Sequence, residues 1–220
     1  MKRITLSALA LLLAATGALA QSTGEFVRAI KADNDIAMQN LLARGMDPNT
    51  RDERGAPGLY LALQEESMKV AQVLLASPRL QPEARNATDE SPLMMAALKG
   101  QLDVARRLIA LGADVNKPGW TPLHYAASRG QVPMMALLLE EHAFIDAQSP
   151  NGTTPLMMAA GFGSPEAVKH LLQAGADTAM RNQKGMSALD FARHYQRPDA
   201  VQLLTQARRA QMPAAPRGQW

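Results

Sequence analysis

A ten-residue motif recurs along this chain at a nearly constant spacing, and it restricts the possible folds more than any other feature. Its copies begin at Ser91, Thr121, Thr154 and Ser187, and the clearest of them reads Thr-Pro-Leu-His-Tyr-Ala-Ala-Ser-Arg-Gly. The second position of the motif steps by 30, 33 and 33 residues through Pro92, Pro122, Pro155 and Ala188. A period of this length is typical of repeat proteins, in which one supersecondary unit stacks on the next.

The residue types within each period predict two short helices. The Ser or Thr that opens the motif can cap a helix, and the proline suits the first helical position because no amide donor is needed there. Gly100 and Gly130 can end this helix in a left-handed conformation. A second landmark, a pair of large aliphatic residues, follows about sixteen residues later and predicts the second helix; the pairs lie at 41–42, 74–75, 108–109, 138–139 and 171–172. A glycine such as Gly112 or Gly175 follows and leads through Asp into a tight turn.

These landmarks resemble the ankyrin-repeat family, with its Thr-Pro-Leu-His start, its Leu-Leu second helix and its Gly-Ala-Asp exit into a hairpin loop. The resemblance covers about residues 24–207 and is strongest from about 87 to 185. It implies an all-α solenoid of about six helix-turn-helix repeats with hairpin loops. The repeats are expected at about residues 24–51, 52–85, 86–118, 119–148, 149–181 and 182–209.

Departures from the repeat pattern predict local differences. The step of 30 residues removes three positions between Asn116 and Gly119, so this hairpin finger should be shortened. The last copy begins Ser187-Ala188-Leu189-Asp190 and is followed by no further hairpin, which indicates a C-terminal capping repeat. We expect the ankyrin-repeat domain to span residues 21–209 and residues 210–220 to form a flexible tail.

The first twenty residues have the pattern of an export signal. Lys2 and Arg3 precede an apolar run, and Ala18-Leu19-Ala20 fits a signal-peptidase site. The alternative, a membrane anchor, is disfavoured because the run is too short to cross a bilayer. We expect cleavage before Gln21, location in the bacterial periplasm or secretion beyond it, and no membrane span in the mature chain.

Composition excludes several kinds of chemistry. The chain has no cysteine, which removes disulfides, thiolate catalysis and sulfur-ligated zinc sites. Without Lys2 and Arg3, 21 basic residues nearly balance 20 acidic ones, and three of the basic residues lie near the C-terminus. We therefore expect no binding of nucleic acid. Aromatic residues make up only 4% of the chain, so the core should consist mainly of Ala, Leu, Met and Val.

No group of residues in the sequence suggests an active site or a cofactor site. The resemblance makes His124 a structural residue that ties adjacent loops, and the other three histidines have no metal-ligand spacing. Catalytic motifs and a phosphate-binding loop are missing. The paired methionines follow the repeat, so at least one of each pair should lie in the core. We expect a protein that is not an enzyme, with no cofactor and no metal.

The resemblance implies that a protein partner binds to a concave face formed by the hairpin tips and the first helix of each repeat. The positions that the family leaves variable include Glu53, Arg54, Gln64, Glu65, Thr88 and Leu98. The candidate partner-binding residues are Trp120, Arg129, Phe162, Arg181, Tyr195, Lys99, Glu90 and Ser128. Aromatic and Arg side chains often dominate interfaces. The alternative is structural: Trp120 would pack over the short finger, and Phe162 and Tyr195 would fill gaps between helices.

The sequence leaves several functions open. The first is a monomeric, non-catalytic module that scaffolds or stabilises a periplasmic enzyme. An immunity-type inhibitor of a toxin that reaches the periplasm is the main alternative, and a secreted effector is another. An enzyme that acts on the cell envelope is disfavoured because the variable positions contain no set of nucleophile, base and orienting group.

Overall fold

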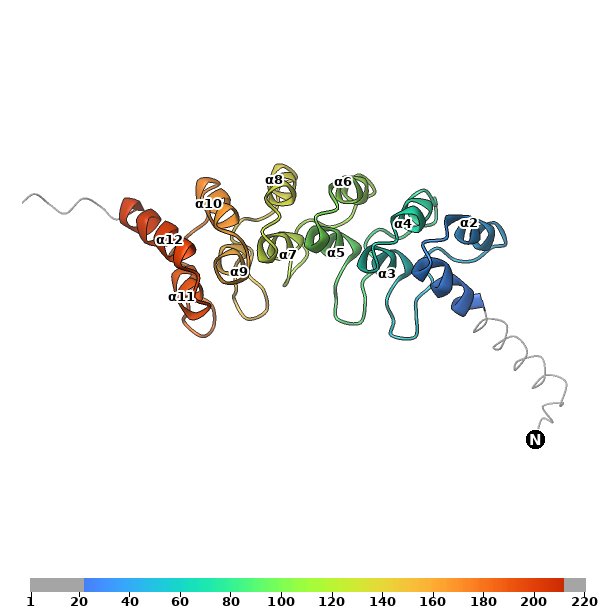
Figure 1. Cartoon of the computed structure of the whole chain (residues 1–220), viewed down its shortest axis with the longest axis horizontal. Coiled ribbons are helices and arrows are strands. Elements are labelled where there is room, and N and C mark those ends of the chain that lie inside the picture. Colours follow the sequence, from blue (N-terminus) through green and yellow to red (C-terminus); the bar gives the residue numbers. More distant parts are fainter. Residues whose placement is uncertain (1–21, 212–220) are drawn as a thin grey trace, which may run out of the picture. The chain divides into compact units, whose positions relative to one another are not determined.

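The structure, a computed structural model, describes residues 22–211 and is all-α in that range, with helices in successive pairs (Figure 1). This confirms the fold class expected from the repeat. The chain divides into two compact units, residues 1–92 (unit 1) and 93–220 (unit 2). The expected signal, residues 1–20, lies outside the described residues, as do residues 212–220 of the expected tail.

Unit 1 contains two helix pairs. A helix over residues 22–31 precedes α2 (Asp35–Ala43), and α3 (Gly58–Gln64) precedes α4 (Met68–Leu75). Phe26, Ile30, Met38 and Leu74 fill the core between them. The buried hydroxyl of Ser67 donates a hydrogen bond of 2.6 Å to the carbonyl oxygen of Ile30, which joins the two pairs.

Unit 2 contains the strongest copies of the motif. We call α5 (Pro92–Lys99), α7 (Pro122–Ser128), α9 (Pro155–Phe162) and α11 (Ala188–His194) the first helices. The second helices are α6 (Leu102–Ala110), α8 (Val132–Glu140), α10 (Pro165–Gln173) and α12 (Pro198–Gln211). Helix α9 packs between α7 and α11, and α10 packs between α8 and α12, so each set forms its own row (Figure 1).

Small residues allow the first helices to approach one another closely. Ala126, Ala127 and Ala160 are fully buried. At Gly163, which ends α9, a Cβ atom would lie 2.3 Å from the carbonyl oxygen of Ala127, so only glycine fits. The paired methionines behave as expected, because Met134 and Met135 are both buried, as are Met94, Met95 and Met157. The core therefore needs few aromatic rings.

The helix ends follow the predicted capping chemistry. Thr154 Oγ1 accepts from the Met157 amide at 3.4 Å. Ser187 forms a reciprocal capping box, in which its Oγ accepts from the Asp190 amide and Asp190 Oδ2 accepts from the Ser187 amide at 2.9 Å. Gly100 and Gly130 have positive φ, as expected. The starts of α9, α10 and α11 are thus supported by their own capping side chains, whereas α6 and α8 begin without a side-chain cap hydrogen bond.

The connections that follow the second helices form the fingers, and one of them is short as predicted. Residues 111–121 join α6 to α7, whereas residues 141–154 and 174–187 make the next two connections. The Asn116 side chain also joins consecutive repeats, since Nδ2 donates to the His142 carbonyl at 2.8 Å and Oδ1 accepts from the Phe144 amide at 2.7 Å. The sequence predicted the turn but not this second role.

Candidate protein-binding surface

His124 connects two neighbouring fingers of unit 2. Its side chain is fully buried, with Nδ1 3.2 Å from the Thr121 amide and Nε2 2.9 Å from the Thr153 carbonyl oxygen. Because an amide can only donate, Nδ1 is unprotonated and Nε2 donates to Thr153. Burial lowers the pKa of His124 from 6.5 to about 4. The imidazole is therefore neutral at pH 7 and structural, which confirms its predicted role.

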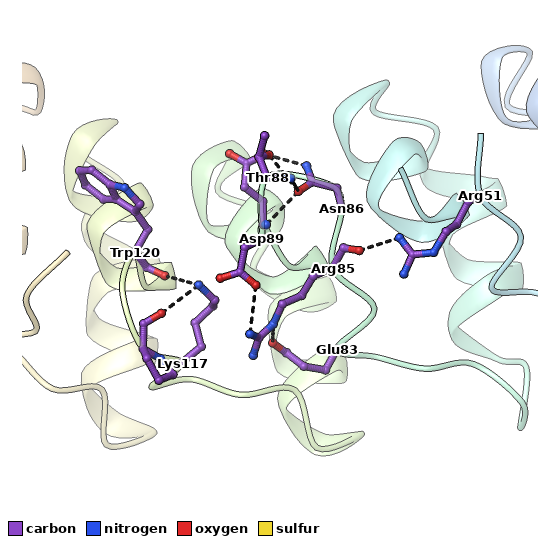
Figure 2. Close-up of polar contacts among 10 residues, drawn as sticks. Arg51, Glu83, Arg85, Asn86, Thr88, Asp89, Lys117 and Trp120 are labelled. Atoms are coloured by element: carbon purple, nitrogen blue, oxygen red, sulfur yellow. Dashed lines mark hydrogen bonds and ion pairs between the residues drawn. The ribbon is translucent and has the colours of Figure 1, made fainter. Parts of the chain in front are cut away.

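Trp120 is held by the short finger. Lys117 is buried, and its Nζ donates to the carbonyl oxygens of Pro118 at 3.0 Å and Trp120 at 3.3 Å (Figure 2). The indole meets the His124 ring edge to face at a centroid distance of 5.2 Å. It remains half-buried. Trp120 thus packs over the short finger, as the structural alternative expected, while part of its ring stays accessible to solvent.

A small apolar hollow, which we call the Trp120 hollow, lies beside this ring. It has a volume of about 230 Å³ and is lined by Leu98, Trp120, His124, Tyr125, Ser128 and Met158. Pockets for small-molecule ligands usually measure roughly 300–1,000 Å³, so the Trp120 hollow suits a single side chain better than a cofactor. The hydroxyl of Ser128 donates to the Tyr125 carbonyl at 2.8 Å, so this predicted contact residue is already hydrogen-bonded within α7.

Phe162 and Tyr195 form an aromatic pair at the ends of α9 and α11. Their ring centroids are 4.4 Å apart, yet the residues are 44% and 41% exposed. Gly161 allows this packing, because a Cβ atom there would lie 2.9 Å from Cδ2 of Tyr195. The pair therefore packs internally and also presents apolar surface to the solvent.

The predicted cations of unit 2 have different environments. Lys99 and Arg129 are exposed at the ends of α5 and α7. The guanidinium of Arg181 is tied to its own finger, with Nη1 2.6 Å from the Gly185 carbonyl oxygen and 3.5 Å from Asp190 Oδ2. Hydrogen bonds from Ser187 lower the pKa of Asp190, which keeps this carboxylate ionised. All three cations are thus exposed, and Arg181 is in addition held by its own finger.

Unit 1 has a separate, larger and more polar hollow of about 720 Å³. The variable positions that the sequence placed on the binding face line it: Glu53, Arg54, Gln64, Glu65 and Thr88. Backbone carbonyls hold the nearby Arg51 guanidinium, with Nη1 2.7 Å from Gly55 O and 2.6 Å from Arg85 O (Figure 2). These contacts order the tips of two fingers around the hollow.

Glu90, the predicted contact residue of unit 1, is hydrogen-bonded within its own finger and to Tyr60 of α3. Its Oε2 accepts from the Tyr60 hydroxyl at 2.7 Å, from Asn86 Nδ2 at 2.8 Å and from Thr88 Oγ1 at 3.1 Å. Burial together with this contact to Glu90 raises the pKa of Tyr60. The sequence did not predict these bonds, because Tyr60 is thirty residues away.

The structure thus brings Trp120 and Ser128 together at one hollow and Phe162 and Tyr195 together in one pair. Tyr125 and Met158 also line the Trp120 hollow, and the sequence did not single them out. They occupy the same place in consecutive repeats, four residues after Thr121 and Thr154. Their shared position in the repeat is the sequence signal that could have identified Tyr125 and Met158 as neighbours on the surface.

Among the described residues, no His, Asp and Glu side chains gather in a group that could hold a metal ion. Within residues 22–211, no helix combines the length and apolar character needed to cross a bilayer.

Comparison with known proteins identifies the repeat. A family model described as ankyrin repeats (3 copies) matches residues 26–118, 59–149, 112–182 and 142–213. The NF-kappa-B p105 subunit of Gallus gallus is 35% identical over 123 residues, which cover 53% of this chain and 12% of that protein. Neurogenic locus notch homolog protein 1 of Xenopus laevis is 31% identical over 116 residues, which cover 51% of this chain and 5% of that protein. The chain therefore spans only a small part of these relatives.

Two solved structures match over nearly their whole length. One is a chain in the structure of the predatory endopeptidase Bd0816 from Bdellovibrio bacteriovorus in complex with immunity protein Bd3460. Its TM-score is 0.72 at 26% identity, with 83% of this chain and 97% of that chain covered. An ankyrin repeat domain from Acinetobacter baumannii gives a TM-score of 0.70 at 25% identity, with 83% and 96% covered. With the repeated motif, the paired helices and the family match in agreement, the chain belongs to the ankyrin-repeat family.

Proposed function

We propose that this protein is a non-catalytic module that binds a protein partner through the first helices and fingers of unit 2. Ankyrin repeats imply protein–protein interaction, and two features of the first helices of unit 2, the exposed Phe162–Tyr195 pair and the Trp120 hollow, carry the assignment to this surface. Contiguous exposed apolar surface often marks an interaction site, and aromatic side chains often supply most of an interface's energy.

Replacing the aromatic side chains tests this surface. Tagged chain would be used to capture partners from a periplasmic extract, and their affinities would be measured for wild type, Trp120→Ala and Tyr195→Ala. Loss of a binding hot spot typically costs about 2 kcal/mol, or roughly thirtyfold in Kd. Ile36→Ala is the control, because Ile36 is a 66% exposed apolar residue of α2 in unit 1 and lines neither hollow. Equal binding by all four proteins, with equal melting temperatures, would contradict the assignment.

We further propose that the partner is an enzyme and that the chain inhibits it, as an immunity-type protein does. The likeness to a chain of the endopeptidase–immunity protein complex favours this function over a scaffold, because it extends over 97% of that chain. The two functions predict opposite effects. A captured enzyme should lose activity on adding one equivalent of the protein if it is inhibited, whereas a scaffold should raise its melting temperature and leave activity intact.

We propose in addition that the protein is exported to the periplasm, on the basis of the signal-like pattern in residues 1–20, and that it is a monomer there. Cell fractionation and N-terminal sequencing should find a mature chain in the periplasm that begins at Gln21. Light scattering after gel filtration should give the mass of one chain. A protein that keeps Met1 and stays in the cytoplasm would contradict the proposed export.

A further inference from the structure

The Phe162–Tyr195 pair is an exposed surface on which a further aromatic ring can pack. The centroids of the two rings are 4.4 Å apart, and the rings of Phe191 and His194 lie 6.1 Å and 4.8 Å from that of Tyr195. Phe162 and Tyr195 are nevertheless 44% and 41% exposed, and the Tyr195 hydroxyl has no hydrogen-bond partner among the residues that the structure describes. An indole suits this surface, because its ring can pack on the pair and its N–H can donate to the hydroxyl.

The segment that follows α12 carries such an indole. Residues 212–220 read Met-Pro-Ala-Ala-Pro-Arg-Gly-Gln-Trp and lie outside the described residues. Each proline restricts its own backbone and that of the residue before it, so this sequence favours an extended polyproline II spacer that loses little freedom on docking. Trp220, one of two tryptophans in the chain, follows the end of α12 by nine residues.

The length of this segment matches the distance to the aromatic pair. Helix α12 begins at Pro198, three residues after Tyr195, and packs on α11. Its fourteen residues rise about 1.5 Å each, so α12 carries the chain about 21 Å away from Tyr195. Nine residues at about 3.1 Å each span about 28 Å, which is enough to return. The Trp120 hollow lies two first helices further along the row, roughly 16–20 Å more, and is therefore out of reach.

We propose that residues 212–220 fold back along unit 2 and that the Trp220 indole packs on the Phe162–Tyr195 pair. The effective concentration of a group on so short a linker is on the order of millimolar, so a contact with a millimolar dissociation constant is occupied in about half of the molecules. A partner that binds the pair must displace Trp220, which makes this segment an intramolecular competitor. The contact itself does not depend on the proposed function.

Aromatic packing, and not charge, drives this contact. Residues 212–220 contain one charged side chain, that of Arg217, and no Asp or Glu. Arg193 and Arg197 lie within two residues of Tyr195, so an ionic attraction between the segment and this end of α11 is disfavoured. Docking should consequently persist when salt is added.

The fluorescence of Trp220 tests the contact in the full chain. In a Trp120→Phe variant, which keeps an aromatic ring at position 120, Trp220 is the only tryptophan. Acrylamide should quench its emission about half as efficiently as that of a synthetic peptide of residues 212–220, because about half of the indoles are covered. This protection should be the same at every protein concentration, since the contact lies within one chain, and it should remain at high salt.

Further changes in this variant provide the decisive comparison. Tyr195→Ala should raise quenching to that of the peptide, whereas Ile36→Ala, which removes a 66% exposed apolar side chain of α2, should not alter it. Deleting residues 213–216 leaves five residues, or about 16 Å of chain, and should also raise quenching to that of the peptide. Pro213→Ala with Pro216→Ala keeps the length and should retain most of the protection. The deletion removes none of the described residues, so it keeps the test valid if Tyr195→Ala fails to fold.

Several outcomes would overturn the inference. These are quenching equal to that of the peptide, protection that rises with protein concentration, and protection that survives both Tyr195→Ala and the deletion.

The captured partner separates this inference from the proposed function. Trp220→Ala should lower the Kd of the partner about twofold, because the pair is then always free. If Trp220 is protected and this Kd does not change, the docking stands and the surface assigned to the partner is wrong. If Tyr195→Ala weakens the partner while Trp220 is quenched like the peptide, the docking is wrong and the proposed function stands.

Discussion

His124 serves the fold and the candidate surface at the same position. Its ring joins Thr121 to the carbonyl of Thr153 and supports the edge of Trp120. Because the ring is buried and neutral, protonation would place a charge in a desolvated site and would set Nδ1–H against the Thr121 amide, which can only donate. The hydrogen bonds that the His124 ring makes with Thr121 and Thr153 therefore depend on pH.

We expect the contribution of His124 to stability to disappear in acid. The unfolded histidine binds a proton below pH 6.5, while the folded one remains neutral until about pH 4. The contribution is therefore fully present above pH 6.5 and falls by about 1 kcal/mol per pH unit between these values. Urea unfolding of wild type and His124→Gln at pH 7.5, 6, 5 and 4 measures this contribution as the difference in the free energy of unfolding. The difference between the two proteins should shrink with each step, and a constant difference would contradict the assigned pKa.

Helix ends show how an element tolerates a departure from the repeat. The second residue after α6, α8 and α10 adopts positive φ, which glycine provides at Gly112 and Gly175 with φ of 91° and 95°. His142 occupies the equivalent place after α8 with φ of 66°, so a residue with a Cβ atom is held in the left-handed region. The carbonyl that accepts from Asn116 belongs to this same residue. The backbone geometry is thus retained although the preferred residue is missing.

Replacing His142 with glycine should stabilise the protein by about 0.5–1 kcal/mol, because it removes the left-handed strain at some cost in chain entropy. Chemical denaturation would measure the change. Gly112→Ala is the converse control, since a Cβ atom there meets nothing within 4 Å and the loss of about 1 kcal/mol should come from φ alone. A His142→Gly protein that is less stable than wild type would show that the imidazole makes a contact that outweighs this strain.

For the molecule as a whole, stability rests on stacking one repeat on the next, and the last repeat must close unit 2. Helix α12 buries Ala200 and Leu204, and it packs on α10 and α11. The Arg197 guanidinium, just before α12, reaches back to the Gly163 carbonyl. A terminal repeat with a polar outer surface prevents the apolar faces of repeat proteins from associating.

Ending the chain at Arg197 should therefore expose the faces of α10 and α11 that α12 covers. We expect a lower melting temperature and concentration-dependent aggregation, measured by calorimetry and light scattering. A chain that ends at Gln211 is the control, because it retains α12 whole. Unchanged melting of the shorter chain would show that α12 does not act as a cap.

Local chemistry explains which parts of the fold could be predicted. Thr154, Ser187 and the glycines encode their helix ends within a few residues, and the step of 30 residues encodes the short finger. The roles of Lys117 and Glu90 could not be predicted this way. The buried ammonium of Lys117 holds the Trp120 carbonyl three residues on, which depends on the path of the short finger. Glu90 bonds to Tyr60 from a different repeat, which depends on how chain segments meet in space.

The amino-acid order alone therefore specifies the repeat, its helices and caps, because these depend on contacts between near neighbours and on a regular apolar period. Packing decides which side chains remain accessible. Leu98, Tyr125 and Met158 line one hollow because three first helices meet there, and Phe162 and Tyr195 form a pair because Gly161 leaves room for a ring. Such juxtapositions join residues some thirty positions apart, and only the folded chain brings them within van der Waals distance.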